Sequence, residues 1–178
     1  MQELKEKDGI RGAINFNMNK EELKNNFDFE KKKHIEFYLP FYEQKNWLLV
    51  QDNIDSNQKN DWDVKLEVFA GQYKTIDEKA LREEHDNFLT EIIQDMKTGN
   101  LGWLFGEKDW ILYGSWNNKE NIEPSSLYLI RSGELKNYIC NLEGFIKTCI
   151  SKKGWGITWN LVLNWKDLIE KNIAEKLI

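Results

Sequence analysis

Apolar and polar residues alternate along two neighbouring stretches near the middle of the chain, which is the pattern of half-buried β-strands. The first stretch, 64–68, has the sequence VKLEV, and the second, 73–79, has the sequence YKTIDEK. Ala70-Gly71-Gln72 between them predicts a three-residue turn in which the glycine supplies a positive φ. Such a turn would pair Phe69 with Tyr73, so we expect one β-hairpin over 61–80.

This hairpin would carry three candidate catalytic side chains on one face. The pairing sets Asp63 opposite Lys79 and places Asp77 diagonal to Asp63. Same-face neighbours two apart on a strand are separated by roughly 7 Å, and cross-strand diagonals by about 7–8 Å. Two carboxylates and an ammonium group would therefore surround a space that could hold a hydrated metal ion.

The stretch 20–44 has the period of an amphipathic helix, with apolar residues at spacings of three and four. Pro40 interrupts this pattern and favours two shorter helices over one. Glu36 lies at the edge of the apolar stripe, from which its carboxylate could reach over the sheet. The alternative for Glu36 is a solvent-exposed residue on the helix surface.

The rest of the chain contains further strand and helix patterns. Strands are expected at 47–50, 110–116, 127–130 and 156–165, and helices at 132–150 and 166–178. The stretch 81–97 fits either a helix or a strand, and a strand is preferred for 88–94. This order predicts a single α/β domain over 20–178, in which helices flank one mixed sheet. The N-terminal segment, 1–19, is charged and then Asn-rich and has no clear period.

Composition and charge narrow the functional classes. The 178 residues are 40% hydrophobic and carry a net charge of −5, which suits one folded domain and argues against a broadly cationic surface. A local basic strip could still bind a polyanion. Its expected members are Lys31, Lys32, Lys33, Lys152 and Lys153.

Several other classes of protein have no support in the sequence. No stretch reaches the roughly 18–20 apolar residues of a membrane span, and residues 1–20 lack the apolar core of a secretory signal. Cys140 and Cys149 fit no zinc or redox spacing, so we expect a protein of the reducing cytoplasm. His34 and His85 are too few for a histidine-based zinc site, and no glycine-rich phosphate loop or nucleophile elbow is present.

A helix glutamate, a strand, an aspartate that opens a hairpin and an Asp-Glu-Lys triplet that closes it follow one another over about residues 28–80. This order resembles the PD-(D/E)XK nuclease superfamily, whose members have the restriction-endonuclease-like fold. Trp62 stands here in place of the proline of the named motif. The resemblance implies that Asp63 and Asp77 bind a metal ion, and that Lys79 orients or activates the attacking water. It also implies an auxiliary acid at Glu36 and a further metal ligand in the backbone carbonyl of Glu78.

The resemblance implies a nuclease that hydrolyses DNA, most simply an endonuclease, with Mg²⁺ or Mn²⁺ as its cofactor. Mg²⁺ prefers hard oxygen ligands and keeps several waters, which two carboxylates and a carbonyl would allow. A homodimer would suit cleavage of both strands. Two alternatives stay open. One is a binding module that stacks sugars or bases on its tryptophans, and the other is a nuclease-like subunit without catalysis.

Overall fold

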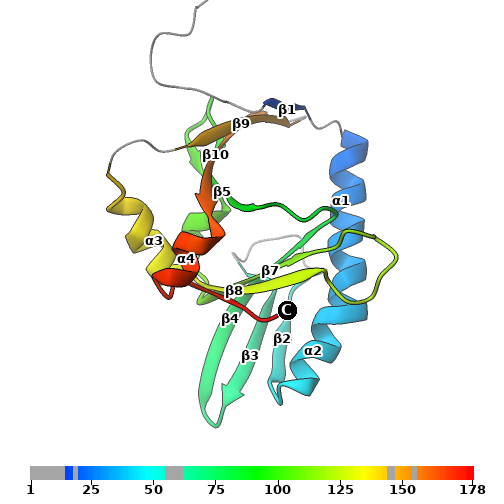
Figure 1. Ribbon diagram of the computed structural model, residues 1–178. Helices are drawn as coiled ribbons and strands as arrows, with labels where there is room; N and C mark the ends of the chain where they lie inside the picture. Colours follow the sequence, from blue (N-terminus) through cyan, green and yellow to red (C-terminus); the bar gives the residue numbers. More distant parts are fainter. Residues whose placement is uncertain (1–14, 18–19, 55–61, 144–146, 154–155) are drawn as a thin grey trace, which may run out of the picture.

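The computed structural model describes residues 15–17, 20–54, 62–143, 147–153 and 156–178 (Figure 1). The first elements are β1 (Asn15–Asn17), α1 (Lys20–Lys33), the π-helical turn η1 (His34–Tyr38), α2 (Leu39–Gln44), β2 (Leu48–Asp52), β3 (Val64–Phe69) and β4 (Gln72–Leu81). The next are β5 (Asn87–Asp95), β6 (Asn100–Leu101), the 3₁₀ turn η2 (Trp103–Phe105), β7 (Trp110–Ser115) and β8 (Ser126–Arg131). The last are α3 (Ser132–Cys140), β9 (Thr148–Lys153), β10 (Gly156–Asn164), α4 (Trp165–Glu170) and β11 (Ala174–Lys176).

The strands form two sheets, whereas the sequence predicted one. The six-stranded sheet has the order β11-β8-β7-β4-β3-β2, and the five-stranded sheet has the order β1-β9-β10-β5-β6. In the first sheet β4 and β7 run parallel and the other neighbours run antiparallel. The predicted mixed α/β class is therefore confirmed. The single sheet was wrong because the chain leaves the first sheet after β4, builds β5 and β6 into the second, and returns as β7.

The six-stranded sheet is covered on both faces. Aromatic side chains of the helical segment 20–44, among them Phe37, Tyr38 and Tyr42, pack on one face against Val64, Ile76 and their neighbours. The other face packs against β5, β10, α3 and α4. Successive side chains of a strand point to opposite faces. In β4, Ile76, Glu78 and Ala80 therefore face the helices, and Asp77 and Lys79 face the second sheet.

The predicted division of the first helical segment is confirmed. The α-helical hydrogen bonding of α1 changes to a π-helical turn at His34, and α2 begins at Leu39. Pro40 lies in the first turn of α2, directly after the π-helical turn, and it has no N–H to contribute to the helical hydrogen bonding there. Figure 1 shows α1 running along the outside of the molecule and α2 continuing it beside β2.

The predicted strands at 47–50, 88–94, 110–116, 127–130 and 156–165 are present, with small differences at their ends. The helix expected over 132–150 is wrong in its second half, because α3 ends at Cys140 and Thr148–Lys153 forms β9 between β1 and β10. The helix expected over 166–178 is also too long. It ends at Glu170, Asn172 takes a positive φ of 56°, and β11 then pairs with β8. In both places strand pairing with distant segments outweighs the local helical period.

The N-terminal segment contributes one described element, β1, which pairs in parallel with β9. The remainder of the segment lies outside the described residues. Among the helices that the structure describes, none is long and apolar enough to cross a membrane.

Candidate functional site

The hairpin of β3 and β4 has a different register from the predicted one. Its turn is Ala70-Gly71, with Gly71 at a φ of 75°, and Phe69 pairs with Gln72 instead of Tyr73. A bulge at Val68 follows, so that Glu67 pairs with Tyr73 and Val64 with Ile76. Asp63 is therefore level with Asp77, not with Lys79. The difference of two positions keeps Asp63 on its expected face, because strand side chains alternate with a period of two.

Asp63, Asp77 and Lys79 all line one cavity of about 280 Å³. The residues of its wall are Trp62, Asp63, Asp77, Lys79, Glu91, Gln94, Leu101, Gly102, Trp103 and Lys108. They come from both sheets, since the hairpin provides one side and β5, β6 and η2 provide the other. The structure thus brings together the two aspartates and the lysine on which the sequence hypothesis depends.

Two carboxylates occupy the edge of β4 beyond the end of β3. The ladder stops at Val64, so the N–H groups of Glu78 and Ala80 have no strand partner on that side. Glu78 N–H donates a hydrogen bond of 2.7 Å to Asp63 Oδ2, and Ala80 N–H donates one to the carboxylate of Glu30 in α1. Asp63 and Glu30 therefore extend the sheet edge with side-chain oxygens and lie beside Lys79.

Asp77 lies between two lysines. Its Oδ1 accepts a hydrogen bond of 2.7 Å from Lys79 Nζ, and its Oδ2 accepts one of 2.7 Å from Lys108 Nζ. The side chains of Asp77 and Lys108 are 6% and 1% exposed, so this ion pair is shielded from water. Both ammonium groups also lie 5.4 Å from the ring centroid of Trp103, within the range of cation–π attraction.

These contacts set the charges of the cavity. Burial alone would raise the pKa of Asp77, but Lys79 and Lys108 together hold that pKa below its ordinary value. Burial would lower the pKa of Lys79, and the carboxylates of Asp77, Glu30 and Asp63 raise it instead. Burial, together with Asp77 and Glu78, raises the pKa of Asp63 to about 8 and that of Glu30 to about 7, although the ammonium group of Lys79 opposes the increase. Lys79 is thus cationic, Asp77 is anionic, and Asp63 and Glu30 titrate near neutral pH.

The opposite wall adds a third carboxylate to the cavity. Glu91 of β5 is only 5% exposed and lies next to Gly102. A Cβ atom at Gly102 would lie 2.2 Å from the Glu91 backbone oxygen and 2.8 Å from its Cγ, so only glycine permits this approach. Gly102 N–H also donates to the carbonyl of Ile92. The start of η2 therefore packs directly on the strand that carries Glu91.

The side chain of Glu78 belongs to the other face of the sheet. Its Oε2 lies 2.8 Å from His34 Nδ1, and its Oε1 accepts a hydrogen bond of 2.7 Å from Tyr42. The second ring nitrogen of His34 lies 3.0 Å from Asp52 Oδ2. Burial would lower the pKa of His34, but Glu78 and then Asp52 raise it to about 9. A buried imidazolium held between two carboxylates therefore supports the reverse side of β4.

Glu36 and the lysines of α1 lie apart from the cavity. Glu36 accepts a hydrogen bond of 3.2 Å from Lys33 and is 3.9 Å from Lys32, and it is not among the described residues that line the cavity. Lys33 is fully buried, and its Nζ donates to the Asn121 carbonyl, so the expectation that Lys33 contacts DNA was wrong. The side chains of Lys152 and Lys153 lie outside the described part of the chain.

Sequence reasoning missed Glu30, Glu91 and Lys108. Glu91 carried a signal, because it is a single charged residue inside the apolar strand FLTEII. Glu30 lies on the same helical segment as Glu36 and could not be preferred without knowing where that segment crosses β4. Lys108 precedes β7 by two positions and reaches Asp77 only because β7 pairs with β4 in parallel. No local pattern indicates that pairing.

Asp63 and Asp77 are the cavity residues that could hold a metal ion. In the described residues, no group of three or more His, Cys, Asp or Glu side chains forms a ready-made metal site. The oxygens of Asp63 and Asp77 are nevertheless of the kind that Mg²⁺ prefers, and they share one polar cavity. Each carboxylate has about four lone-pair directions, so Asp77 can accept its lysines and still offer a direction to an ion.

Comparison of the chain with protein families, curated proteins and solved structures found no match of any of the three kinds. The functional argument therefore depends on the residues and geometry of the cavity itself.

Proposed function

We propose that this protein is a metal-dependent nuclease that hydrolyses phosphodiester bonds of DNA. The observation that carries the proposal is the convergence of Asp63, Asp77 and Lys79 on one cavity. The order of helix acid, strand, hairpin aspartate and Asp-Glu-Lys triplet in the structure supports a restriction-endonuclease-like core made of α1, β2, β3 and β4.

Asp63 and Asp77 would hold Mg²⁺ or Mn²⁺ through their carboxylate oxygens, with the backbone carbonyl of Glu78 as the further ligand in this proposal. When bound, such an ion lowers the pKa of water and offsets negative charge on the phosphate. Lys79 orients the attacking water with its ammonium group. In the reaction, the water oxygen forms a bond to phosphorus and gives up a proton to the solvent, one P–O ester bond breaks, and the departing oxygen takes up a proton from the solvent.

The acid of the first helix is Glu30 rather than Glu36 in this proposal. Glu30 contacts the backbone of β4 at Ala80 and interacts electrostatically with Lys79, whereas Glu36 pairs with Lys32 and Lys33. Glu30 does not line the cavity among the described residues, so it acts through Lys79 as a positioning residue.

Lys108 supplies the second cation of the site. Burying an unpaired ammonium group costs roughly several kcal/mol. Asp77 provides the anion that pairs with the buried ammonium group of Lys108. Because Lys79 and Lys108 both contact Asp77, a phosphate near Asp77 would meet positive charge from two directions. The net charge of −5 therefore does not prevent local attraction of a polyanion.

The test is incubation of purified protein with plasmid, single-stranded DNA, branched DNA and RNA, with Mg²⁺, with Mn²⁺ and with EDTA. We expect DNA cleavage that requires the metal ion and is lost in Asp77→Asn. Asp86→Asn is the matched control, because Asp86 is exposed and does not line the cavity. Metal-dependent cleavage that survives in Asp77→Asn would assign the activity elsewhere, and no cleavage of any substrate would favour a binding role.

The tryptophan-based binding alternative gains little from the structure. Trp116 and Trp165 are buried in the two cores, and Trp110 packs on Trp47 at 5.4 Å between centroids. Trp155 lies outside the described residues. The two tryptophans beside the acidic residues, Trp62 and Trp103, belong to the cavity wall.

A further inference from the structure

The cavity has two walls, and this shape limits what can reach Asp63 and Asp77. One wall is the hairpin, and the other is formed by Glu91, Gly102 and Trp103 with their neighbours from the second sheet. Its volume of about 280 Å³ is near the lower end of small-ligand pockets, which span about 300–1,000 Å³. A B-form duplex, whose major groove alone is about 12 Å wide, could not enter such a space whole and could present to it only the groups at its surface.

The two tryptophans of the wall have different surroundings. Trp103 is held in place, since its ring makes an edge contact with Phe88 at 6.2 Å and lies against the ammonium groups of Lys79 and Lys108. Trp62 directly precedes Asp63, lines the cavity and is half-exposed. Trp62 is therefore the aromatic surface that a group entering the cavity beside Asp63 would meet.

Bases of single-stranded nucleic acid commonly stack on aromatic side chains, and lysines beside them neutralise the phosphates. The cavity offers both elements within one space: an indole next to the acidic residues and two lysines bound to Asp77. In a duplex, the base next to a phosphate is stacked and paired, so it cannot turn towards Trp62 without being unpaired first.

We propose that the substrate of this site is an unpaired strand of DNA, with the base beside the scissile phosphate stacked on Trp62. This inference rests on the proposed nuclease function and names its substrate class. Single strands, flaps and frayed ends all provide such a nucleotide, whereas an intact blunt duplex does not.

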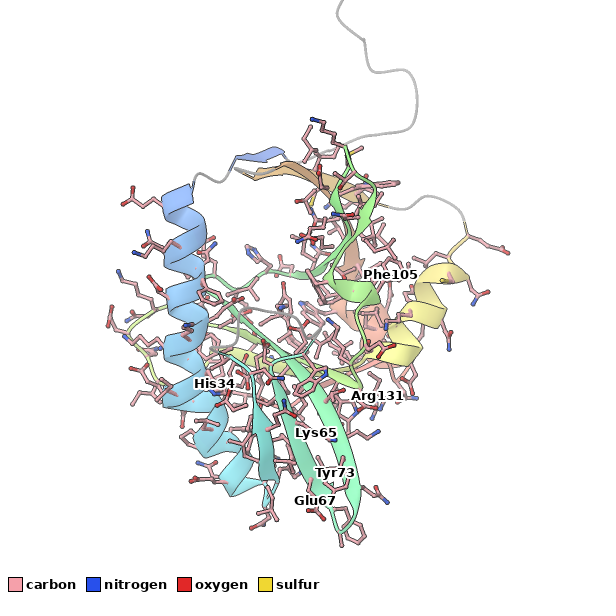
Figure 2. The ribbon with its side chains drawn as sticks, turned by 180° about the vertical axis from the view of Figure 1, so that it is seen from behind. His34, Lys65, Glu67, Tyr73, Phe105 and Arg131 are labelled. Carbon is pink, nitrogen blue, oxygen red and sulfur yellow. The ribbon has the colours of Figure 1, made fainter. Side chains whose placement is uncertain are left out.

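The experiment separates binding from cleavage. Fluorescence anisotropy of labelled oligonucleotides of one mixed sequence, as single-stranded DNA, flap, blunt duplex and single-stranded RNA, gives affinity with Ca²⁺ in place of Mg²⁺. The same DNA substrates with Mg²⁺ give cleavage rates. Trp62→Ala and Trp62→Phe are compared with Tyr73→Ala, because Tyr73 is 49% exposed and lies towards the tip of the hairpin, away from Phe105 of η2 (Figure 2).

We expect tighter binding and faster cleavage of the single strand and the flap than of the duplex. Trp62→Ala should weaken single-strand binding by about 5- to 150-fold, the range for loss of one stacked base, with Trp62→Phe in between and Tyr73→Ala unchanged. Equal use of duplex and single strand, or wild-type single-strand binding in Trp62→Ala, would overturn the inference while leaving the nuclease proposal intact. Preference for RNA over DNA would overturn the stated substrate. If single strands bind in a Trp62-dependent way but are not cleaved, the nuclease proposal is rejected and the proposal that the site binds unpaired DNA is kept.

Discussion

Glu78 N–H donates its hydrogen bond to the side chain of Asp63, at 2.7 Å, one residue before β3 begins at Val64. An aspartate expected to act only as a metal ligand therefore also completes the hydrogen bonding of the strand that carries Asp77 and Lys79. The carboxylate of Asp63 thus has a structural role, through its Oδ2, and a proposed role as a metal ligand. Substitutions of Asp63 can separate these two roles.

Asp63→Asn and Asp63→Ala should differ in stability and agree in activity. Asparagine retains an oxygen that accepts from Glu78 N–H, whereas alanine leaves this donor without its partner, at a cost of about 1–3 kcal/mol in the free energy of unfolding. Both variants lose the carboxylate and should lose metal-dependent cleavage. Urea unfolding followed by circular dichroism, together with a cleavage assay, checks both parts. Equal stabilities of the two variants would count against the structural role of Oδ2.

Lys79→Met and Lys108→Met should slow cleavage and leave Mg²⁺ binding in place, because neither removes an oxygen ligand. Each variant keeps one lysine on Asp77, so the carboxylate stays paired. We expect a larger loss of kcat in Lys79→Met, since Lys79 is assigned to the attacking water, and a larger rise in KM in Lys108→Met. Lys97→Met, on an exposed residue outside the cavity, is the control. Rates of both variants equal to the control would remove the lysines from the mechanism.

Glu30→Gln and Glu36→Gln form a matched pair on one continuous helical segment. Glu30 lies beside Lys79, so its loss of charge should slow cleavage severalfold, whereas Glu36→Gln changes contacts with Lys32 and the buried Lys33 outside the cavity and should leave the cleavage rate unchanged. Cleavage rates of the two proteins under identical metal concentrations decide between them. A slow Glu36 variant beside a normal Glu30 variant would restore the original assignment of the helix acid.

Asp77→Asn should destabilise the protein as well as inactivate it. Removing the negative charge leaves the buried ammonium group of Lys108 and the partly exposed one of Lys79 without this partner, and breaking a buried ion pair such as the one with Lys108 costs about 3–5 kcal/mol. The double variant Asp77→Asn/Lys108→Met should recover part of that loss, because it removes one of the two cations. Denaturant midpoints of wild type, single and double variants provide the measurement. If the double variant were no more stable than Asp77→Asn alone, the unpaired charge of Lys108 would not be the cause of the lost stability.

The stability of the protein should depend on pH through His34. Its pKa is about 9 in the folded protein and near the ordinary value of 6.5 when unfolded. A group whose pKa rises on folding stabilises fully below the unfolded pKa and loses this contribution as the pH increases through the folded pKa. The free energy of unfolding of wild type should therefore fall between about pH 6.5 and pH 9.

The control for this pH dependence is His34→Gln, which removes the titrating ring. Asp63 and Glu30, whose raised pKa values also favour the folded state at lower pH, are present in both proteins and cancel in the difference. Chemical unfolding at several pH values gives the free energy of unfolding of each protein. The values for wild type and variant should converge as the pH rises. A difference in the free energy of unfolding that stays constant with pH would show that His34 does not cause the pH dependence.

The sequence by itself determined the hairpin and the face of the hairpin on which each side chain lies. Alternation over 64–68 and 73–79 sets Asp63, Asp77 and Lys79 on one face, and this face is insensitive to the bulge at Val68, which shifts the register by an even number of positions. The division of the helical segment near Pro40 was also local, because proline has no backbone N–H to donate and its ring crowds the preceding turn of a helix.

Only the tertiary structure decided which other groups join the hairpin residues. Lys108 reaches Asp77 through the parallel pairing of β7 with β4, Glu91 through a second sheet, and Glu30 through the crossing of α1 over the open edge of β4. The same distant pairing turned 148–153 and 174–176 from expected helix into β9 and β11. Periodicity describes which face of an element is buried, but the partner of that face depends on contacts between residues far apart in the chain, which no local pattern contains.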